Sequence, residues 1–306
     1  MRKVCLKSMA KLAAMDERVV FIGSDITKRD LEDFSDHYPE RFFLEGVYEA
    51  HIVGMAAGMA LCGKMPYINT IATFLTRRCY EQILLDVGLH KLPVRLLGSG
   101  GGVVYAPLGP THLANEDMAI LRAIPNMSIV APCDAEEMGR LMPATLTWPG
   151  PMYIRLAKGG DKVVSRADLG FEIGKAILMQ EGADVLFVTT GITTQIGLEA
   201  AAKLAGEGIG ASVLHMHTVK PLDTEALVRL AGRVRAVVTA EEHTVIGGLG
   251  SAVAETLLEA GVAKPFKRLG FPDVFTEELG SQNDIMGKYG ISVEGLCATA
   301  KKLLGK

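Results

Sequence analysis

Several features that would place this chain in a familiar class are missing from its sequence. The five cysteines are isolated, with no Cys-x-x-Cys pair or Cys/His cluster, which excludes a disulfide framework or a zinc site of the usual spacing. No uninterrupted apolar run approaches the roughly 20 residues that a membrane-spanning helix needs. There is no Lys/Arg-rich stretch, the formal net charge is −3 and the pI is about 6.2, so neither a membrane nor nucleic acid is an expected partner.

Common catalytic motifs are also missing, since no P-loop, G-x-S-x-G elbow or H-E-x-x-H sequence occurs. The stretch GGLGSAVAE (247–255) follows an expected strand and opens an expected helix, as a dinucleotide-binding turn would. Its third glycine position is Val253, however, so a tight strand-to-helix turn is the favoured interpretation.

The first 17 residues, MRKVCLKSMAKLAAMDE, predict an amphipathic helix. Lys11, Asp16 and Glu17 stand where a signal peptide would need an apolar segment and a cleavage site. Together with the unpaired cysteines, this favours a cytoplasmic location.

Short β-branched runs alternate with helical stretches, which predicts an α/β protein with two consecutive parallel-sheet domains. At 306 residues and 49% hydrophobic content, two domains are expected. The segment AKGGDKVVSRADLG (157–170) interrupts the alternation and predicts a linker, giving domains at 1–160 and 171–306. Strands are expected at 18–24, 66–72, 93–100, 127–132, 152–157, 184–191, 211–219 and 235–242, and helices at 49–61, 74–89, 135–146, 193–208, 224–231 and 251–261.

The segment GVYEAHIVGMAAG (46–58) sets one acid, Glu49, at the start of an apolar helix. A glutamate at a helix N-terminus is usually only a favourable contact with the helix dipole. Here the residues that follow are almost all small or apolar, so burial opposes ionisation while the helix terminus favours it. A carboxyl group in that balance can share a proton with a ring nitrogen of a ligand.

Two further stretches are candidates for a site. GPTHL (109–113) places His112 in a Gly/Pro loop after a strand, where α/β sheets bind ligands, although an exposed loop histidine is equally expected from position alone. TFLTRRCY (73–80) spaces Phe74, Arg77 and Tyr80 at i, i+3 and i+6, which is consistent with one helix face. An aromatic pair at such spacing is more often part of a core than a surface for a flat ring.

Taken together, the stretches resemble the transketolase family of thiamine diphosphate (ThDP) enzymes. The resemblance to the pyrimidine-binding (PYR) domain and then to the transketolase C-terminal domain covers essentially the whole chain, in family order, and its wording is also close to deoxyxylulose-phosphate synthases. The segments that carry it are FIGSDI (21–26), GVYEAHIVG (46–54), INTIATFLTRRCYEQILLDV (68–87), GPTHL, PMYIRLAKG (151–159), HTVKPLD (217–223), VVTAEEHTVIGGLGSAVAETL (237–257) and RLGFPDVF (268–275).

The resemblance implies a transferase that moves a two-carbon ketol unit, with Glu49 as the catalytic residue that hydrogen-bonds the pyrimidine ring of ThDP. Phe74 and Tyr80 match the aromatic positions that pack on that ring, and Arg77 stands where ordinary transketolases carry an aromatic residue. Asp25, in GSDI, matches an acid close to the cofactor.

The resemblance also implies a substrate-binding set. His112 matches an active-site histidine near the substrate carbonyl, and Lys158 and Arg2 match phosphate-binding positions, with Lys158 in place of an arginine. Two positions depart from the family pattern: Leu108 replaces an aspartate that contacts a sugar hydroxyl, and SGGG (99–102) has Gly100 where a phosphate-binding histidine is usual. We therefore expect an acceptor without that hydroxyl or with a different anionic end.

The Gly-Asp-Gly…Asn motif, with which the family holds the diphosphate through Mg²⁺, does not occur in this sequence. We therefore expect no metal site of its own, a separate N-terminal subunit that carries the motif and the Mg²⁺, and an α₂β₂ assembly around a homodimer core.

Three alternatives remain open on sequence alone: the β subunit of a 2-oxoacid dehydrogenase E1, half of a deoxyxylulose-phosphate synthase-like enzyme, and a non-catalytic paralogue. Glu49, Phe74 and His112 argue against the last of these.

Overall fold

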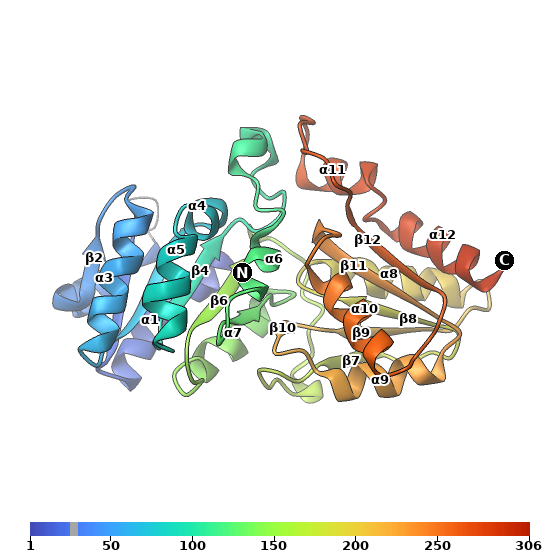
Figure 1. Ribbon diagram of the computed structural model, residues 1–306, viewed down its shortest axis with the longest axis horizontal. Helices are drawn as coiled ribbons and strands as arrows, with labels where there is room; N and C mark the ends of the chain where they lie inside the picture. The colour runs from blue at the N-terminus through green and yellow to red at the C-terminus, as the bar shows by residue number, and fades with distance from the viewer. Residues whose placement is uncertain (25–29) are drawn as a thin grey trace.

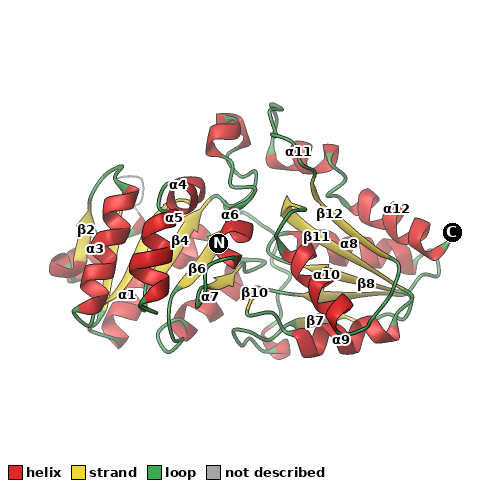
Figure 2. Ribbon diagram, in the orientation of Figure 1, coloured by secondary structure: helices red, strands yellow, loops and turns green. Residues whose placement is uncertain are grey.

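The computed structural model describes residues 1–24 and 30–306, and it consists of two α/β halves, each built on its own sheet. In Figure 1 the first half, residues 1–160, lies on the left, and the second half, residues 171–306, lies on the right. Figure 2 shows that helices flank the strands in both halves. The predicted α/β class with largely parallel sheets is confirmed, although each sheet also contains one antiparallel edge strand.

The first sheet has seven strands in the order β10-β5-β6-β4-β3-β1-β2. All neighbours are parallel except β10 and β5. Parallel strands of this kind end at one edge of the sheet, which is where α/β proteins bind ligands. The strands are β1 (Val19–Gly23), β2 (Phe42–Leu44), β3 (Met65–Ile71), β4 (Arg95–Ser99), β5 (Ser128–Val130), β6 (Met152–Leu156) and β10 (Thr218–Lys220).

Helices cover both faces of this sheet, since every residue of its central strand β4 is buried. One face packs on α1 (Arg2–Met15), α2 (Glu32–His37) and α7 (Ala135–Ala144), and α1 confirms the helix expected at the N-terminus. The other face packs on α3 (Glu49–Leu61), α4 (Ala72–Arg77) and α6 (Asp117–Arg122). Shorter turns of helix are η2 (Pro39–Arg41), η4 (Ala106–Leu108) and η5 (Pro110–His112).

The prediction of one continuous helix over 74–89 is wrong. The segment divides into α4, α5 (Tyr80–Gln82) and the π-helical turn η3 (Ile83–Leu89). At the break, the Thr76 hydroxyl donates to the carbonyl of Ala72 at 2.8 Å, and the Cys79 thiol to that of Phe74 at 3.5 Å. Such side-chain bonds to the preceding turn compete with the helical ladder and bend helices.

The second sheet has five strands in the order β12-β11-β8-β9-β7, with β7 antiparallel to β9. Helices again pack on both of its faces. Its elements are η6 (Ala167–Leu169), β7 (Ile177–Gln180), β8 (Val185–Thr189), α8 (Thr193–Ala205), β9 (Ala211–His215), α9 (Thr224–Arg233), β11 (Ala236–Thr244), α10 (Leu249–Glu259), β12 (Phe266–Phe271), α11 (Gln282–Lys288) and α12 (Val293–Leu304).

The two halves are joined through a strand that changes sheets. The single strand predicted at 211–219 is in fact two, because β9 ends at His215 and β10 then adds to the edge of the first sheet beside β5. The expected linker also packs on the first half, since the backbone N–H groups of Val164 and Ser165 donate to Asp134 at 2.8 and 2.6 Å. The second half, through β10, and the linker are therefore both attached to the first half.

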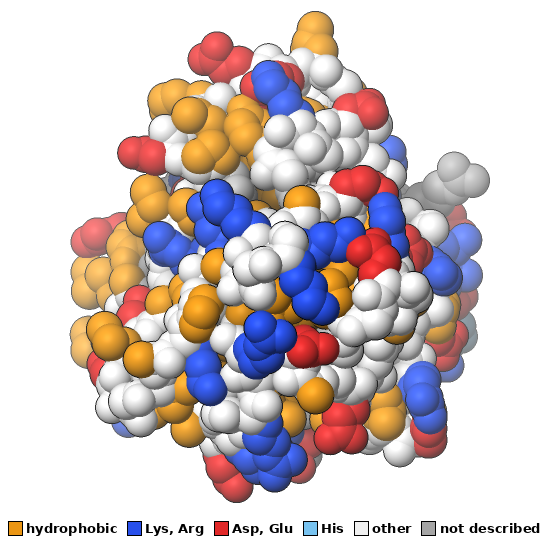
Figure 3. Space-filling view, turned by 90° about the vertical axis from the view of Figure 1, so that its right-hand side faces the viewer, with side chains coloured by type: hydrophobic (Ala, Val, Ile, Leu, Met, Phe, Trp, Pro, Cys, Tyr) orange, Lys and Arg blue, Asp and Glu red, His pale blue; other side chains and the backbone are white. Residues whose placement is uncertain are grey.

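The outer face of the second half carries acidic and basic side chains interspersed with one another (Figure 3). This mixture agrees with the small formal net charge of −3. In the part of the chain that the structure describes, no helix is both long and apolar enough to cross a bilayer.

The centre of the first sheet should be the most sensitive part of the fold. Leu97 on β4 is fully buried, so Leu97→Ala should lower the free energy of unfolding by about 2–5 kcal/mol and shift the thermal and urea midpoints downward. Leu258→Ala on α10, where the side chain is 79% exposed, is the matched control and should stay within about 0.5 kcal/mol. Equal losses in the two variants would contradict this account of the core.

Candidate functional site

Most of the residues predicted to form a site follow strands of the first sheet at its carboxyl edge. Glu49 comes after β2, Phe74 after β3, His112 after β4 and Lys158 after β6. Asp25 comes after β1 in the sequence and lies outside the described residues. Because parallel strands end at the same edge, residues up to 109 positions apart in the chain meet on one side of the sheet.

Glu49 is the first residue of α3, and only 2% of it is exposed. Its carboxylate accepts a hydrogen bond of 2.7 Å from Nη1 of Arg78, and this contact is also an ion pair. The Arg78 side chain is 48% exposed. A buried carboxylate at the apolar helix, as the sequence predicts, is therefore present, and an arginine that the prediction did not include is its partner.

The aromatic residue next to this pair is Phe74. Cζ of Arg78 lies 4.5 Å from the centroid of the Phe74 ring. The ring also meets His112 at 5.2 Å between centroids and an interplanar angle of 69°, an edge-to-face contact. Glu49, Arg78, Phe74 and His112 thus form one continuous group, which we call the Glu49 cluster.

His112 ends the short turn η5 and is half-buried, and its Nδ1 lies 3.0 Å from the Thr111 hydroxyl. Gly109 precedes this turn with a φ of +79°, a conformation that favours glycine. Leu108, beside it, is 55% exposed. The loop therefore presents a histidine and an apolar side chain near each other in sequence at the edge of the sheet.

Gly100 has a structural reason to lack a side chain. Its φ is +79°, and a Cβ placed there would lie 2.1 Å from the ring of Tyr105. The space into which a histidine at this position would extend is therefore filled by Tyr105, and the glycine is part of the packing of this loop.

Arg77 and Tyr80, two of the residues predicted to contact the cofactor, make other contacts in the structure. The Arg77 guanidinium forms an ion pair with Glu116 and donates to the carbonyl of Leu113 at 2.8 Å. Tyr80 begins the separate helix α5 and packs against the hydrophobic cluster beneath α3. Since α4 ends at Arg77, the prediction that Phe74, Arg77 and Tyr80 share one helix face is wrong.

The two residues expected to bind an anion lie on neighbouring segments. Lys158 is exposed just beyond β6, and Arg2 is the first residue of α1. The N-terminus reaches this strand end, because the backbone N–H of Ala157 donates to Sδ of Met1 at 3.5 Å. Figure 1 places the N-terminus near the middle of the molecule.

A groove of about 830 Å³ opens between the two halves, close to the cluster. One wall includes Arg77, Pro110, Thr111 and Glu116, and the other includes residues 272–277. Phe275 on the second wall is 84% exposed. Glu49 does not line this groove, so the groove adjoins the Glu49 cluster through Arg77 and the GPTHL loop without containing its carboxylate.

Beneath the loop, a buried polar network joins the halves. Arg155 on β6 donates to both carboxylate oxygens of Asp117, at 2.8 and 3.0 Å, and to the carbonyl of Glu242 at 2.9 Å. The Tyr153 hydroxyl also donates to Asp117, at 2.6 Å. Burial raises the pKa of Glu242 to about 7, even though Arg155 and Gln282 lie close by and favour the charged form.

The backbone N–H groups of the glycine-rich turn before α10 are already hydrogen-bonded to a side chain of the protein. The carboxylate of Glu241 accepts from the backbone N–H groups of Leu249 and Gly250 at 2.7 and 2.8 Å. A dinucleotide's pyrophosphate would need these same donors. This supports the interpretation of GGLGSAVAE as a tight turn.

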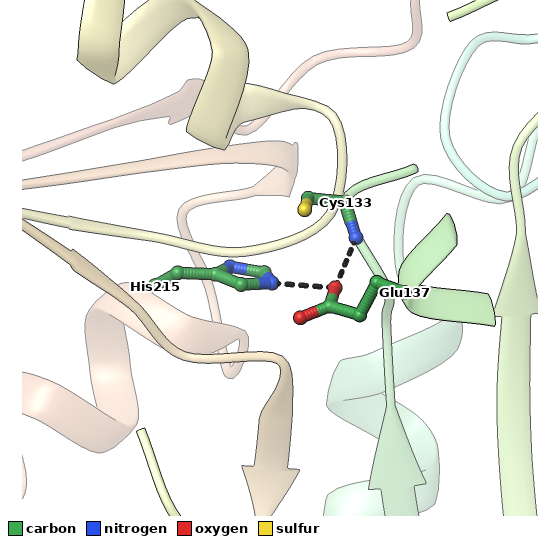
Figure 4. Close-up of side chains that lie close together, drawn as sticks. All are labelled: Cys133, Glu137 and His215. Atoms are coloured by element: carbon green, nitrogen blue, oxygen red, sulfur yellow. Dashed lines mark hydrogen bonds and ion pairs between the residues drawn. The ribbon is translucent and has the colours of Figure 1, made fainter. Parts of the chain in front are cut away.

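A second cluster of ionisable side chains lies deep between the halves (Figure 4). Cys133 and Glu137 belong to the first half, His215 ends β9 in the second, and their donor atoms lie within 4.8 Å of one another. Such a set could hold a metal ion. Glu137, however, already accepts from the N–H of Cys133 at 2.6 Å and from Nε2 of His215 at 2.8 Å. Hydrogen bonding in this buried contact between the two halves, which we call the joint, therefore explains the arrangement.

This joint contains groups that titrate abnormally. Burial raises the pKa of Glu137, but His215, His217 and the backbone N–H of Cys133 together outweigh it, and the pKa falls to about 2. Burial lowers the pKa of His217 to about 4, and its ring stacks on Phe171 at 4.5 Å. Both groups therefore make the joint sensitive to acid.

Sequence reasoning missed Arg78 and the polar groups between the halves. The doubled arginine in TFLTRRCY was visible, and its second arginine stands four residues after Phe74, a spacing at which helical side chains are neighbours. Arg78 caps α4 in a helical conformation, and its guanidinium lies over the Phe74 ring. The i, i+4 spacing could therefore have identified that contact, whereas the bond from Arg78 to Glu49 leaves no such signal.

Comparisons with known proteins give one consistent result. The family model described as the transketolase pyrimidine-binding domain matches residues 1–160, and that of the transketolase C-terminal domain matches residues 174–296. A 6-deoxy-6-sulfo-D-fructose transketolase subunit from Clostridium sp. is 38% identical over 99% of this chain and 94% of its own length. One of the subunits of an apulose-4-phosphate transketolase from Phocaeicola vulgatus is 35% identical over 100% of this chain and 97% of its own.

Among solved structures, a split gene transketolase described as an inactive β₄ tetramer aligns with a TM-score of 0.90 and 37% identity. The alignment covers 99% of this chain and 97% of that one.

The joint between the halves predicts a dependence of stability on pH. His217 has a folded pKa of about 4 and an unfolded value of 6.5, so the unfolded chain binds more protons between these values. Its contribution to stability is complete above pH 6.5 and is lost as the pH falls toward 4, by about 3 kcal/mol at most. Glu137 adds a further loss between 4.5 and about 2. His217→Gln should flatten the fall of the thermal midpoint between pH 7 and pH 4.5.

The control for this measurement is His90→Gln, since His90 is exposed on the same chain. It should reproduce the wild-type pH profile. A His217→Gln profile with the wild-type slope would show that His217 does not titrate as its burial implies.

Proposed function

The chain belongs to the transketolase family of transferases, and we propose that it is the β subunit of a split ThDP-dependent transketolase. In this proposal it supplies the PYR and C-terminal domains, divided at 1–160 and 171–306. A two-carbon ketol unit moves from a ketose to an aldose at a site completed by another subunit.

The observation that carries the proposal is the Glu49 cluster. A carboxylate that is almost fully buried at the N-terminus of α3 faces a planar cation, and the cation lies over the ring of Phe74. The aminopyrimidine of ThDP is likewise planar and polar, and it needs a carboxyl partner and an apolar face. The residues present therefore fit this half of the coenzyme.

When bound, ThDP supplies a carbon nucleophile and an electron sink for the two-carbon unit. In the proposed mechanism, Glu49 holds a proton against the pyrimidine ring nitrogen. The apolar residues of α3 keep water from that contact, which strengthens it. Phe74 fixes the plane of the ring.

His112 is proposed to act on the substrate. Its ring is held by the edge-to-face contact with Phe74 and by Thr111, so it lies beside the ring position without occupying it. From there, an imidazole N–H can donate to a substrate oxygen on which negative charge develops.

A second chain is part of the proposal. The sequence has no Gly-Asp-Gly…Asn motif, so the diphosphate and its Mg²⁺ are assigned to an N-terminal subunit. Support comes from the relatives that are named as subunits or as a split gene transketolase. We propose an α₂β₂ assembly around a β dimer, acting in carbohydrate metabolism. The isolated thiols of this chain suit a reducing cytoplasm.

The proposed substrates are ketoses with an anionic end. The two named relatives act, by their names, on a sulfonated and a phosphorylated sugar. Arg2 and Lys158 lie on adjoining segments at the edge of the sheet and would face that anionic end. Leu108 favours a sugar without a hydroxyl at its position, because burying an unpaired hydroxyl against it is costly.

Glu49→Gln tests the role of the carboxyl group. In the assembled pair of subunits with ThDP and Mg²⁺, the variant should slow exchange of the coenzyme C2 proton, followed by NMR, by about 10²–10⁴-fold, because a glutamine cannot supply the proton. Glu17→Gln, an exposed carboxylate in the same half, is the control. Exchange at the wild-type rate in Glu49→Gln would remove Glu49 from the mechanism and with it the proposed function.

Lys158→Met tests whether Lys158 binds the anionic end of the substrate. We expect kcat/KM to fall about 5- to 20-fold for phosphorylated or sulfonated ketoses and to change little for the matching neutral sugars, since only the charge contact is lost. Lys162→Met is the control, because that exposed side chain pairs with Glu199. Equal losses on charged and neutral sugars would assign Lys158 a structural role.

A further inference from the structure

We propose that Arg78 is a built-in substitute for the coenzyme's pyrimidine ring: its guanidinium fills the half-site on Glu49 and Phe74 and has to leave before the ring can bind. The inference rests on the proposed function and names a regulatory step of that same site.

The geometry of the guanidinium reproduces both contacts that an aminopyrimidine would make. Nη1 donates to the Glu49 carboxylate at 2.7 Å, and Cζ lies 4.5 Å from the centroid of the Phe74 ring. A guanidinium is flat, carries N–H donors at its edge and stacks on aromatic faces, as a protonated aminopyrimidine does. The same carboxylate and the same ring face cannot serve both groups at once.

The burial of Glu49 explains why a substitute is needed. Only 1% of its side chain is exposed. An ionised carboxylate without a partner at such a position is strongly unfavourable, whereas a charge-assisted hydrogen bond satisfies it. The apolar helix α3 offers no polar side chain nearby in its first turn other than His51, which is exposed. Arg78 therefore supplies the partner that the buried carboxylate requires.

The surroundings of Arg78 also allow it to leave. Its side chain is 48% exposed, and within the described residues its only side-chain hydrogen bond is the one to Glu49. The neighbouring Arg77 is held differently, by Glu116 and by the Leu113 carbonyl. Of the two adjacent arginines, one is anchored to the GPTHL loop and the other can turn into solvent by side-chain rotation alone.

In the lone subunit, the ring can bind only to molecules in which Arg78 has left Glu49. The apparent affinity is therefore the intrinsic affinity multiplied by the small fraction of such molecules. The lone chain should therefore bind the pyrimidine weakly. Removing Arg78 should raise the affinity without adding any contact to the ligand.

The test uses the full chain alone and a neutral probe, the hydroxymethyl aminopyrimidine that forms one half of thiamine. A neutral probe avoids a general effect of charge on binding. Affinities are measured by calorimetry or ligand-observed NMR for wild type, Arg78→Met, Arg78→Lys and Glu49→Gln. The control is Arg18→Met, an arginine that is 51% exposed and paired with Asp16 elsewhere in the same half. Circular dichroism and thermal unfolding confirm that each variant is folded.

We expect Arg78→Met to bind the probe about fivefold more tightly than wild type, as the loss of one competing ion pair implies. The affinity of Arg78→Lys for the probe should lie between those of wild type and Arg78→Met, because an ammonium keeps the charge but is not planar and cannot stack on the ring. Arg18→Met should match wild type. A thermal midpoint that falls in Arg78→Met and recovers on adding the probe would independently confirm that the two groups share one place.

Two results would overturn the inference, and only the second would also reject the proposed pyrimidine site. Unchanged or weaker binding in Arg78→Met, with binding lost in Glu49→Gln, would show that Arg78 does not compete, while the proposed function stands. Absence of binding in every variant, or binding that is indifferent to Glu49→Gln, would reject both the inference and the proposed pyrimidine site.

Discussion

The buried carboxylate of Glu49 is the constraint around which the first half of the molecule is arranged. The strand β2 delivers it to the start of an apolar helix, where 2% of the residue is exposed. A charge in that position requires a partner, and the fold provides a planar cation backed by an aromatic ring. The cluster therefore satisfies its own buried charge and presents a carboxylate and an aromatic ring that suit a flat, polar heterocycle.

In the proposed function, another subunit completes this site. Its residues lie on one edge of the first sheet, and a groove lined by both halves opens beside it. The halves themselves are joined by strand β10 and by buried hydrogen bonds from Arg155 to the Glu242 carbonyl and from His215 to Glu137.

Sequence reasoning identified the family and the fold class, and the comparisons confirmed both. The alternation of strands and helices was sufficient because parallel sheets buried on both faces produce short apolar runs of regular length. Local errors arose where side chains compete with the backbone. The helix over 74–89 is broken where Thr76 and Cys79 bond to carbonyls of the preceding turn, and the strand over 211–219 changes sheets after His215.

The positions of Phe74, His112 and Lys158 along the chain could be read from the sequence, because each follows a strand that the hydrophobic pattern predicted, and Glu49 was identified by the apolar helix that it begins. Their mutual arrangement was decided only by the tertiary structure. Arg78 belongs to the site because its guanidinium reaches the buried carboxylate of Glu49, 29 residues away in the chain, and Gly100 lacks a side chain because Tyr105 fills the space. The contact between Arg78 and Glu49 depends on packing between two separate segments, and such packing leaves no periodic mark in either segment.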